Sequence, residues 1–236
     1  MKVLVVDIGG THVKAMVSGQ RSARQFDSGP DLLPKNMVAE TNRLVDGRGY
    51  DVVSIGYPGP VLRDRPIAQP HNLGRGWVGF DFEKAFGRPV KVVNDAAMQA
   101  LGSYKGGKML FLGLGTGLGS ALVVDGIVEP MELSHLPYRK RTYEHYVGEK
   151  GLKREGKTKW RRLVDDVVAR FVGALEPDDV VLGGGNARLL KELPPKCRVG
   201  SNANAFLGGF RLWKNSPDQA ERKQKRKVQP TAEIVR

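Results

Sequence analysis

The sequence predicts an α/β protein with two lobes built from one duplicated unit. Two glycine-rich hairpins carry this prediction. Residues 3–17 (VLVVDIGGTHVKAMV) and residues 109–123 (MLFLGLGTGLGSALV) each contain an apolar strand, a Gly/Thr turn and a second apolar strand. The chain has 236 residues, enough for two lobes of about a hundred residues each. We expect lobes over residues 1–106 and 107–214, followed by a basic, disordered tail over 215–236.

Both turns are suited to phosphate, because glycine leaves the backbone N–H groups accessible to an anion. The first is Gly9-Gly10-Thr11 and the second contains Gly115-Thr116-Gly117; at the same offset Ala15 aligns with Ala121. The alternative is a pair of structural turns, but the repetition favours two phosphate loops that face each other across a cleft. Each turn leads into a strand, so this is not the dinucleotide fingerprint, and the chain has no Walker lysine motif.

Composition narrows the class of protein. The formal charge of +13 and the pI near 9.9 favour polyanionic ligands, yet we find no nucleic-acid-binding signature. No apolar run reaches the ~20 residues of a membrane span, and the charged start of the chain is unlike a signal peptide. The single Cys197 rules out an intramolecular disulfide and a multi-cysteine zinc site, and it favours the reducing cytosol. We expect it to be an inert apolar side chain.

In the first lobe, helical spacing predicts a helix over 34–45, and a strand over 51–55 follows. That strand leads into Gly56-Tyr57-Pro58-Gly59-Pro60, which is either a structural turn or a stiff loop held against a ligand. Asp81 predicts the start of a short helix that Gly87 ends.

A further strand over 90–93 ends at Asn94-Asp95, and a helix is expected over 96–104. Asn and Asp are favoured helix caps, so capping alone is one interpretation of this pair. Catalysis is the other, because open α/β sheets present functional groups at the carboxyl ends of their strands. The neighbouring phosphate loops favour catalysis.

In the second lobe, a polar segment contains Glu132, Ser134, His135 and Glu144. A lone histidine is more often structural, but the two nearby carboxylates favour a cluster that binds hydroxyl groups. A basic segment over 150–162 merges into an amphipathic helix that continues to Leu175. We further expect a strand over 180–185, a helix over 186–193 and a closing helix over 206–213. Basic residues crowd the region after the polar segment and predict either a solvated surface or a track for a polyanion: Lys140, Arg141, Lys150, Lys153, Arg154, Lys157, Lys159, Arg161 and Arg162.

Six motifs in this order resemble the ROK family of sugar kinases, and most closely its polyphosphate glucokinases: DIGGTHVK, GYPGP, VVNDAAMQALG, LGLGTGLGSAL, ELSH and VVLGGG. The resemblance extends from Asp7 to about Trp213. It implies an actin/hexokinase-like (ribonuclease H-like) fold with the active site in the cleft between the lobes. It also implies transfer of a phosphoryl group from polyphosphate and/or ATP to the 6-hydroxyl of glucose or a related hexose, with Mg²⁺. A homodimer is implied; a membrane or specific nucleic acid is not.

The resemblance also implies roles for individual residues. Asp95 matches the catalytic base, and Asp7 matches the aspartate that positions the magnesium–phosphate group indirectly. The sugar-binding residues would be Asn72, Asn94, Asp95, Glu132, His135 and Glu144. The residues at the donor would be Asp7, Gly9, Gly10, Thr11, Lys14, Gly115, Thr116, Gly117, Gly183 and Gly184, with Gly185 in the same loop beside a nucleotide base.

The chain departs from the family pattern at three places. The cysteine-rich zinc loop that follows the histidine in many members is replaced by residues 137–143, so we expect no structural zinc. Ser134 stands where glycine is usual, which bears on the geometry of the sugar clamp. The sequence starts directly at the first strand, so we do not expect a repressor with the DNA-binding domain of some ROK proteins. Two alternatives to a polyphosphate-using kinase stay open: a strictly ATP-dependent hexose kinase, and a catalytically silent sugar- or polyanion-binding protein.

Overall fold

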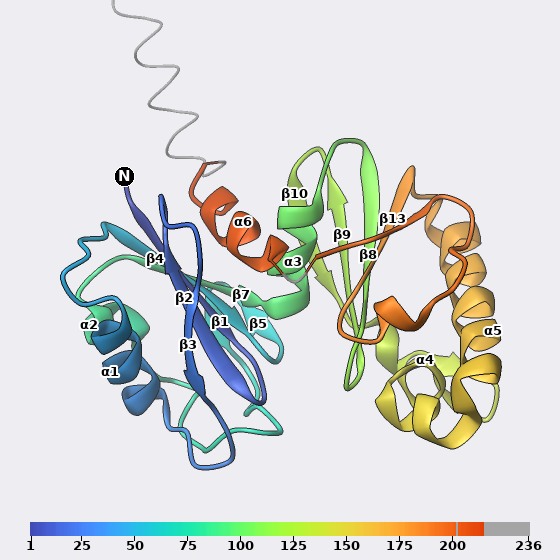
Figure 1. Ribbon diagram of the computed structural model, residues 1–236, viewed down its shortest axis with the longest axis horizontal. Coiled ribbons are helices and arrows are strands. Elements are labelled where there is room, and N and C mark those ends of the chain that lie inside the picture. Colours follow the sequence, from blue (N-terminus) through green and yellow to red (C-terminus); the bar gives the residue numbers. More distant parts are fainter. Residues whose placement is uncertain (202, 215–236) are drawn as a thin grey trace, which may run out of the picture.

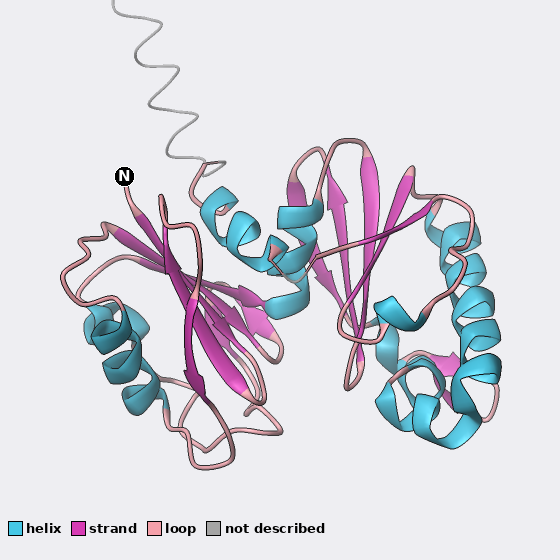
Figure 2. Cartoon of the chain, viewed as in Figure 1, coloured by secondary structure: helices cyan, strands magenta, loops and turns pink. Residues whose placement is uncertain are grey.

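Two five-stranded sheets with helices on both faces make up the protein, as a computed structural model shows for residues 1–201 and 203–214 (Figures 1 and 2). The first sheet has the order β3-β2-β1-β4-β7. Its strands are β1 (Val3–Ile8), β2 (His12–Val17), β3 (Arg24–Asp27), β4 (Val52–Tyr57) and β7 (Val90–Asn94). Strands β1, β4 and β7 run parallel, so their carboxyl ends share one edge.

The second sheet repeats this topology with the order β10-β9-β8-β13-β14. Its strands are β8 (Lys108–Leu114), β9 (Leu118–Val124), β10 (Ile127–Met131), β13 (Asp179–Gly183) and β14 (Cys197–Val199). In both sheets three antiparallel strands are followed by two parallel ones. This confirms the duplicated α/β fold predicted from the two hairpins.

The alignment predicted inside the hairpins is wrong by one residue on the second strand. Four residues (9–12) separate the paired ends of β1 and β2, whereas three (115–117) separate those of β8 and β9. Once β1 is aligned with β8 by the side chains that face outward, Ala15 corresponds to Ser120 rather than Ala121. The shorter second turn has shifted the register.

Helices cover the outer face of each sheet (Figure 1). On the first sheet, α1 (Pro34–Leu44) and α2 (Phe82–Phe86) bury Met37, Val38 and Phe82 against the outward side chains of β1 and β2. On the second, α5 (Glu149–Leu175) buries Trp160 and its apolar stripe. Asp81 caps α2 by accepting a hydrogen bond from the Lys84 N–H, and Gly87 ends it in the left-handed region, as predicted.

Two helices lie between the sheets and join the lobes: α3 (Asp95–Ser103) and α6 (Asn204–Arg211) (Figure 1). The two helices cross closely, at glycines that leave no room for a side chain. A Cβ on Gly102 would lie 1.8 Å from the Asn204 carbonyl oxygen, and a Cβ on Gly208 would lie 1.8 Å from the Met98 carbonyl oxygen. Ala205 and Phe206 of α6 pack against β1, so this part of the segment expected in the second lobe contacts the first sheet.

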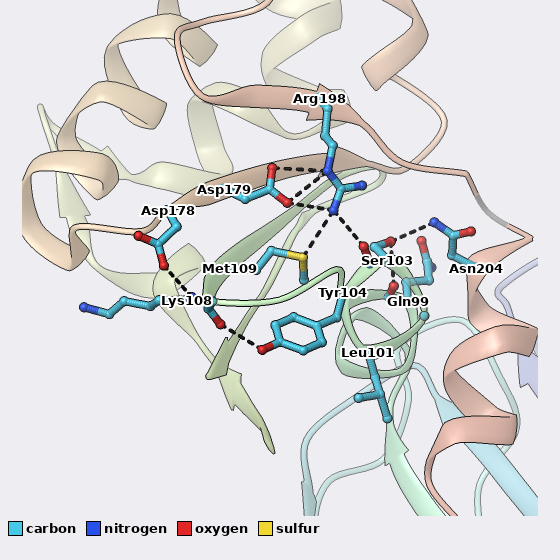
Figure 3. A network of polar contacts seen from close by, with 12 residues as sticks. Gln99, Leu101, Ser103, Tyr104, Lys108, Met109, Asp178, Asp179, Arg198 and Asn204 are labelled. Carbon is cyan, nitrogen blue, oxygen red and sulfur yellow. Dashed lines mark hydrogen bonds and ion pairs between the residues drawn. The ribbon is translucent and has the colours of Figure 1, made fainter. Parts of the chain in front are cut away.

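A polar network ties α3 to the second sheet (Figure 3). Arg198 of β14 pairs with Asp179 of β13 at 2.7 Å and donates a hydrogen bond to the Ser103 carbonyl oxygen, also at 2.7 Å. Asn204 donates to the Ser103 hydroxyl at 2.9 Å. The end of α3 is therefore held by β14 and α6 together.

The remaining short elements are β5 (Val61–Leu62), β6 (Arg65–Pro66), η1 (Leu133–His135), β11 (Pro137–Tyr138), β12 (Arg141–Thr142), α4 (Tyr143–Val147) and η2 (Ala187–Leu189). The helix predicted over 186–193 is wrong: only the 3₁₀ turn η2 forms, because the chain becomes extended at Leu190 and returns to pair as β14. Helix α5 is kinked at Gly156, whose φ of 75° requires glycine. The predicted tail over 215–236 lies outside the described residues. Over the described part, no helix is both long and apolar enough to cross a membrane.

Candidate active site

Two carboxylates at the shared edge of the first sheet form the centre of the candidate site. Asp7 lies in β1, and Asp95 follows β7 as the first residue of α3. Burial raises the pKa of Asp7 to about 6, opposed by Lys14, its cross-strand partner on β2. Burial, and next the charge of Asp7, raise the pKa of Asp95 to about 7, while hydrogen bonds from backbone N–H groups oppose the rise. The two carboxyl groups therefore share one electrostatic environment.

Asn94 supplies the cap of α3. Its Oδ1 accepts hydrogen bonds from the N–H groups of Ala96 and Ala97, and its Nδ2 donates to the Gly59 carbonyl oxygen at 3.1 Å. Asn94 therefore caps α3, and its amide connects the helix to the loop that contains Gly59. Asp95 Oδ1 accepts a hydrogen bond from the Ala96 N–H at 2.7 Å, and the charge of Asp7 acts on this carboxyl group.

The first glycine turn is held on two sides. The Gly9 N–H donates to the His12 carbonyl oxygen at 3.0 Å, and Ser28 donates to the carbonyl oxygens of Gly9 and Thr11. On the other side Asn72 covers Gly10, where an added Cβ would lie 3.3 Å from the Asn72 Nδ2. Asn72, a predicted sugar-binding residue, thus lies beside the predicted donor turn.

The second turn lies against Glu144. The Leu118 N–H donates to Glu144 Oε2 at 3.4 Å, and a Cβ on Gly117 would lie 2.3 Å from the same oxygen. Only glycine at 117 therefore leaves room for this carboxylate. The predicted sugar residue Glu144 and the predicted donor turn are in direct contact.

The loop after β13 also packs on the second turn. Gly184 has a φ of 78°, and a Cβ there would lie 2.4 Å from the Leu114 carbonyl oxygen. A Cβ on Gly183 would likewise lie 2.5 Å from the Phe111 side chain. Asn186 extends this contact by donating from Nδ2 to the Gly115 carbonyl oxygen at 3.2 Å.

Glu132 immediately precedes η1 and His135 is its last residue, with His135 Nε2 3.5 Å from Glu132 Oε2. Both side chains are exposed, and the charge of Glu132 raises the pKa of Asp95, so Glu132 is within electrostatic reach of the Asp7–Asp95 pair. Ser134 adopts an ordinary 3₁₀ conformation without positive φ, so the serine introduces no backbone strain.

Sequence reasoning missed Ser28 and Ser120, whose hydroxyls bond to backbone next to predicted site residues. No sequence motif marks either serine. The register of β9 against β10, which pairs Ser120 with Met131, would have placed Ser120 next to Glu132. Two surface cavities, of about 410 Å³ beside α1 and about 590 Å³ beside α5, contain none of the predicted residues. The candidate site is therefore identified by its functional side chains and not by either of these cavities. Over the described chain, no three His, Cys, Asp or Glu side chains form a metal-binding group.

The ROK family profile matches residues 3–129, more than half of the chain. The chain belongs to the ROK family. Among curated proteins, this ROK protein is 24% identical over 205 residues to a polyphosphate glucokinase of Mycobacterium tuberculosis, covering 78% of this chain and 77% of the relative.

Solved structures share its fold. An inorganic polyphosphate/ATP-glucomannokinase from Arthrobacter sp. strain KM matches with a TM-score of 0.77 at 21% identity, over 91% of this chain and 99% of that one. A ROK family glucokinase from Streptomyces griseus in complex with glucose and AMPPNP matches with a TM-score of 0.73 at 16% identity, over 90% and 99%. The actin/hexokinase-like fold expected from the motifs is confirmed.

Proposed function

We propose that this protein is a hexose kinase that moves a phosphoryl group from polyphosphate and/or ATP to the 6-hydroxyl of glucose or a related hexose. The observation that carries the proposal is the environment of Asp95. This carboxylate lies where a strand ends, its pKa is near 7, and it is within electrostatic reach of Asp7 and Glu132. The names of the curated and structural relatives, polyphosphate glucokinase and glucokinase, support the same reaction class.

Asp95 is the general base. A carboxylate whose pKa lies near the working pH accepts a proton readily while still being ionised in a large fraction of molecules. As the sugar hydroxyl attacks the terminal phosphorus, Asp95 takes the hydroxyl proton. The bond from phosphorus to the bridging oxygen of the donor breaks, and the shortened donor leaves. Glu132, His135, Glu144, Asn72 and Asn94 orient the sugar in this proposal, and the two glycine turns hold the donor phosphates.

Asp7 fits a magnesium ion. Its carboxylate oxygens are ligands of the kind that Mg²⁺ prefers, and a cation beside Asp7 would relieve the repulsion that raises the pKa of Asp95. When bound, the ion neutralises negative charge on the transferring phosphoryl group. Lys14, which faces Asp7 from β2, supplies a further positive charge for the same phosphates.

A cluster of cations beside the second turn supports polyphosphate as a donor. Burial and the nearby charges of Arg154, Arg141 and Lys150 lower the pKa of His145, the residue next to Glu144. Other members of the predicted basic track are engaged otherwise: Lys153 pairs with Glu149, Lys159 with Glu155, and Arg161 with the Leu189 carbonyl oxygen. The proposed polyphosphate contact is Arg141, Lys150 and Arg154 (the His145 cluster), next to Glu144 and the second turn. Within this cluster Arg154 also pairs with Glu155 at 2.8 Å and donates to the His145 carbonyl oxygen at 2.9 Å.

The test is a panel of glucose, mannose and N-acetylmannosamine against ATP and polyphosphate, each with Mg²⁺, for the wild type and Asp95→Asn. We expect sugar phosphate with at least one donor and a loss of ~10²–10⁴-fold in kcat for the variant. No turnover with any pair, combined with measurable sugar binding, would favour the silent sugar-binding alternative. Turnover with ATP alone would favour the strictly nucleotide-dependent kinase. Homodimerisation and a cytosolic location stay predictions.

A further inference from the structure

Two serine hydroxyls next to the site bond to backbone on either side of proposed functional groups. We propose that Ser120 is the positioning residue for the sugar-binding Glu132, and that Ser28 is the positioning residue for the donor turn. This inference rests on the proposed function, because it names what each half of the site is built to hold. Neither serine is proposed to touch a reacting atom.

Ser120 lies in β9 with 2% of its surface exposed. Its hydroxyl donates to the Met131 carbonyl oxygen at 2.7 Å and accepts from the Leu133 N–H at 3.2 Å. These two groups are the immediate neighbours of Glu132 in the chain. Bound on both sides by one hydroxyl, the backbone of Glu132 has a fixed direction where β10 ends and η1 begins. Without that hydroxyl, the Leu133 N–H loses a partner in a buried place, and the segment must move to find another.

Ser28 follows β3 and binds the first turn twice. Its hydroxyl donates to the Gly9 carbonyl oxygen at 2.7 Å, and its N–H donates to the Thr11 carbonyl oxygen at 2.9 Å. A trans peptide unit is planar and its C=O and N–H point in opposite directions. Because the Gly9 carbonyl points at Ser28, the N–H of Gly10, an exposed residue, points away from Ser28. Ser28 therefore sets the direction of an N–H group offered to the donor.

The two serines belong to different lobes and contact different segments, so their effects separate by substrate. The Ser120 hydroxyl bonds to the segment around Glu132, and Ser28 bonds to the first turn. A general loss of stability would affect both substrates alike. A positioning role predicts a crossed pattern instead.

The experiment compares Ser120→Ala and Ser28→Ala with Ser103→Ala as the matched control. Ser103 is equally buried and donates to the Gln99 carbonyl oxygen at 2.8 Å, but lies at the far end of α3. For Ser120→Ala we expect KM for the sugar to rise about tenfold with KM for the donor within twofold. For Ser28→Ala we expect the reverse. Ser120→Thr and Ser28→Thr retain the hydroxyl and should restore most of the lost affinity.

Direct binding keeps the inference separate from the proposed reaction. Calorimetric Kd values for glucose, and for Mg²⁺ with ATP or polyphosphate, are measured on the same folded variants, with Tm as the check of folding. A wild type without turnover would overturn the proposed function, while a crossed pattern in Kd would still uphold the two serines. Equal losses for both ligands in each variant, or losses matched by Ser103→Ala, would overturn the positioning roles.

Discussion

At the residue scale, the chemistry of the site depends on how two neighbouring carboxylates affect each other. Asp95 lies at the start of a helix, a place that normally favours the ionised form. Burial and the charge of Asp7 outweigh that preference and hold the pKa of Asp95 near 7. Lys14 opposes the same effect of burial at Asp7, whose pKa stays lower, near 6. The function proposed above assigns these two identical side chains different roles, a base and a metal-side carboxylate.

The pH dependence of catalysis follows from these values. The proposed base Asp95 acts only when it is ionised, so we expect kcat/KM for the sugar to rise with pH and then level off. The midpoint should lie at or below about 7, because Mg²⁺ beside Asp7 would lower the pKa of Asp95. The pair titrates together, so the measured midpoint belongs to both carboxyls. Initial rates from pH 5 to 9 at saturating donor check this. A flat profile over that range would exclude a base with this pKa.

Ionisation of Asp95 should lower the stability of the folded protein as the pH rises, whereas it should raise the activity. The folded pKa of Asp95 is about 7 against an ordinary value of 3.8, so the folded state holds the proton more tightly between these values. The stabilisation that protonated Asp95 contributes is fully present below pH 3.8, decreases as the pH rises, and is lost above about pH 7. Asp95→Asn removes the unfavourable charge. We therefore expect its Tm to exceed that of the wild type at pH 8 and the difference to shrink at pH 4. A variant less stable at pH 8 would contradict this.

At the element scale, an aromatic cluster occupies residues 138–143, the segment that stands in place of the zinc loop expected from the family pattern. Tyr138 is buried, stacks on Tyr143 with ring centroids 4.8 Å apart, and donates its hydroxyl to Asp166 of α5 at 2.5 Å. Arg139 and Arg170 lie over its ring. This cluster lies between His135 and Glu144 in the chain and anchors both ends of that segment to α5.

We predict that the folded protein contains no structural zinc, because this cluster supplies the packing and one cysteine cannot supply the ligands. Elemental analysis of protein purified without a metal-binding tag should find far less than one zinc per chain. EDTA should leave Tm unchanged, whereas Tyr138→Ala should lower it, since losing a buried aromatic ring costs about 3–5 kcal/mol. Stoichiometric zinc would contradict the prediction that this segment binds no metal.

The crossing of α3 and α6 makes a second prediction at this scale. A methyl group at Gly208 would lie 1.8 Å from the Met98 carbonyl oxygen, so Gly208→Ala must push the helices apart. We expect a loss of stability of about 1–3 kcal/mol by denaturant unfolding. Gly173→Ala in α5 is the matched control, because nothing lies within 4 Å of the added methyl. Helix propensity predicts a gain there of up to about 1 kcal/mol. A tolerated Gly208→Ala would mean that the helices do not cross this tightly.

At the scale of the whole molecule, the net charge of +13 raises the question of what the positive surface attracts. Part of it is paired with carboxylates, as at Lys153, Lys159 and Arg154. In the His145 cluster, burial and the charges of Arg154, Arg141 and Lys150 together lower the pKa of the His145 imidazole. Repulsion of this kind is relieved by an anion with several closely spaced charges.

Salt dependence therefore distinguishes a polyphosphate track from a solubilising surface. We expect KM for long polyphosphate to rise steeply with salt and KM for ATP to rise much less, because a longer chain releases more counterions. The double variant Arg141→Gln/Lys150→Gln should weaken polyphosphate use and flatten its salt dependence. Lys35→Gln/Arg48→Gln, which removes equal charge from the first lobe, is the control. Equal effects of both double variants would indicate a non-specific surface.

The sequence by itself determined the duplicated fold, the two glycine turns, the capped helices α2 and α3 and the family, because these depend on local patterns that are read along the chain. It could not determine the register of the second hairpin, the absence of the helix over 186–193, or strands as short as β14, since each depends on pairing between distant segments. The sequence likewise could not determine the raised pKa of Asp95 or the contacts of Ser28, Ser120 and Glu144. They exist only once two sheets and the helices between them bring separate segments within a few ångströms.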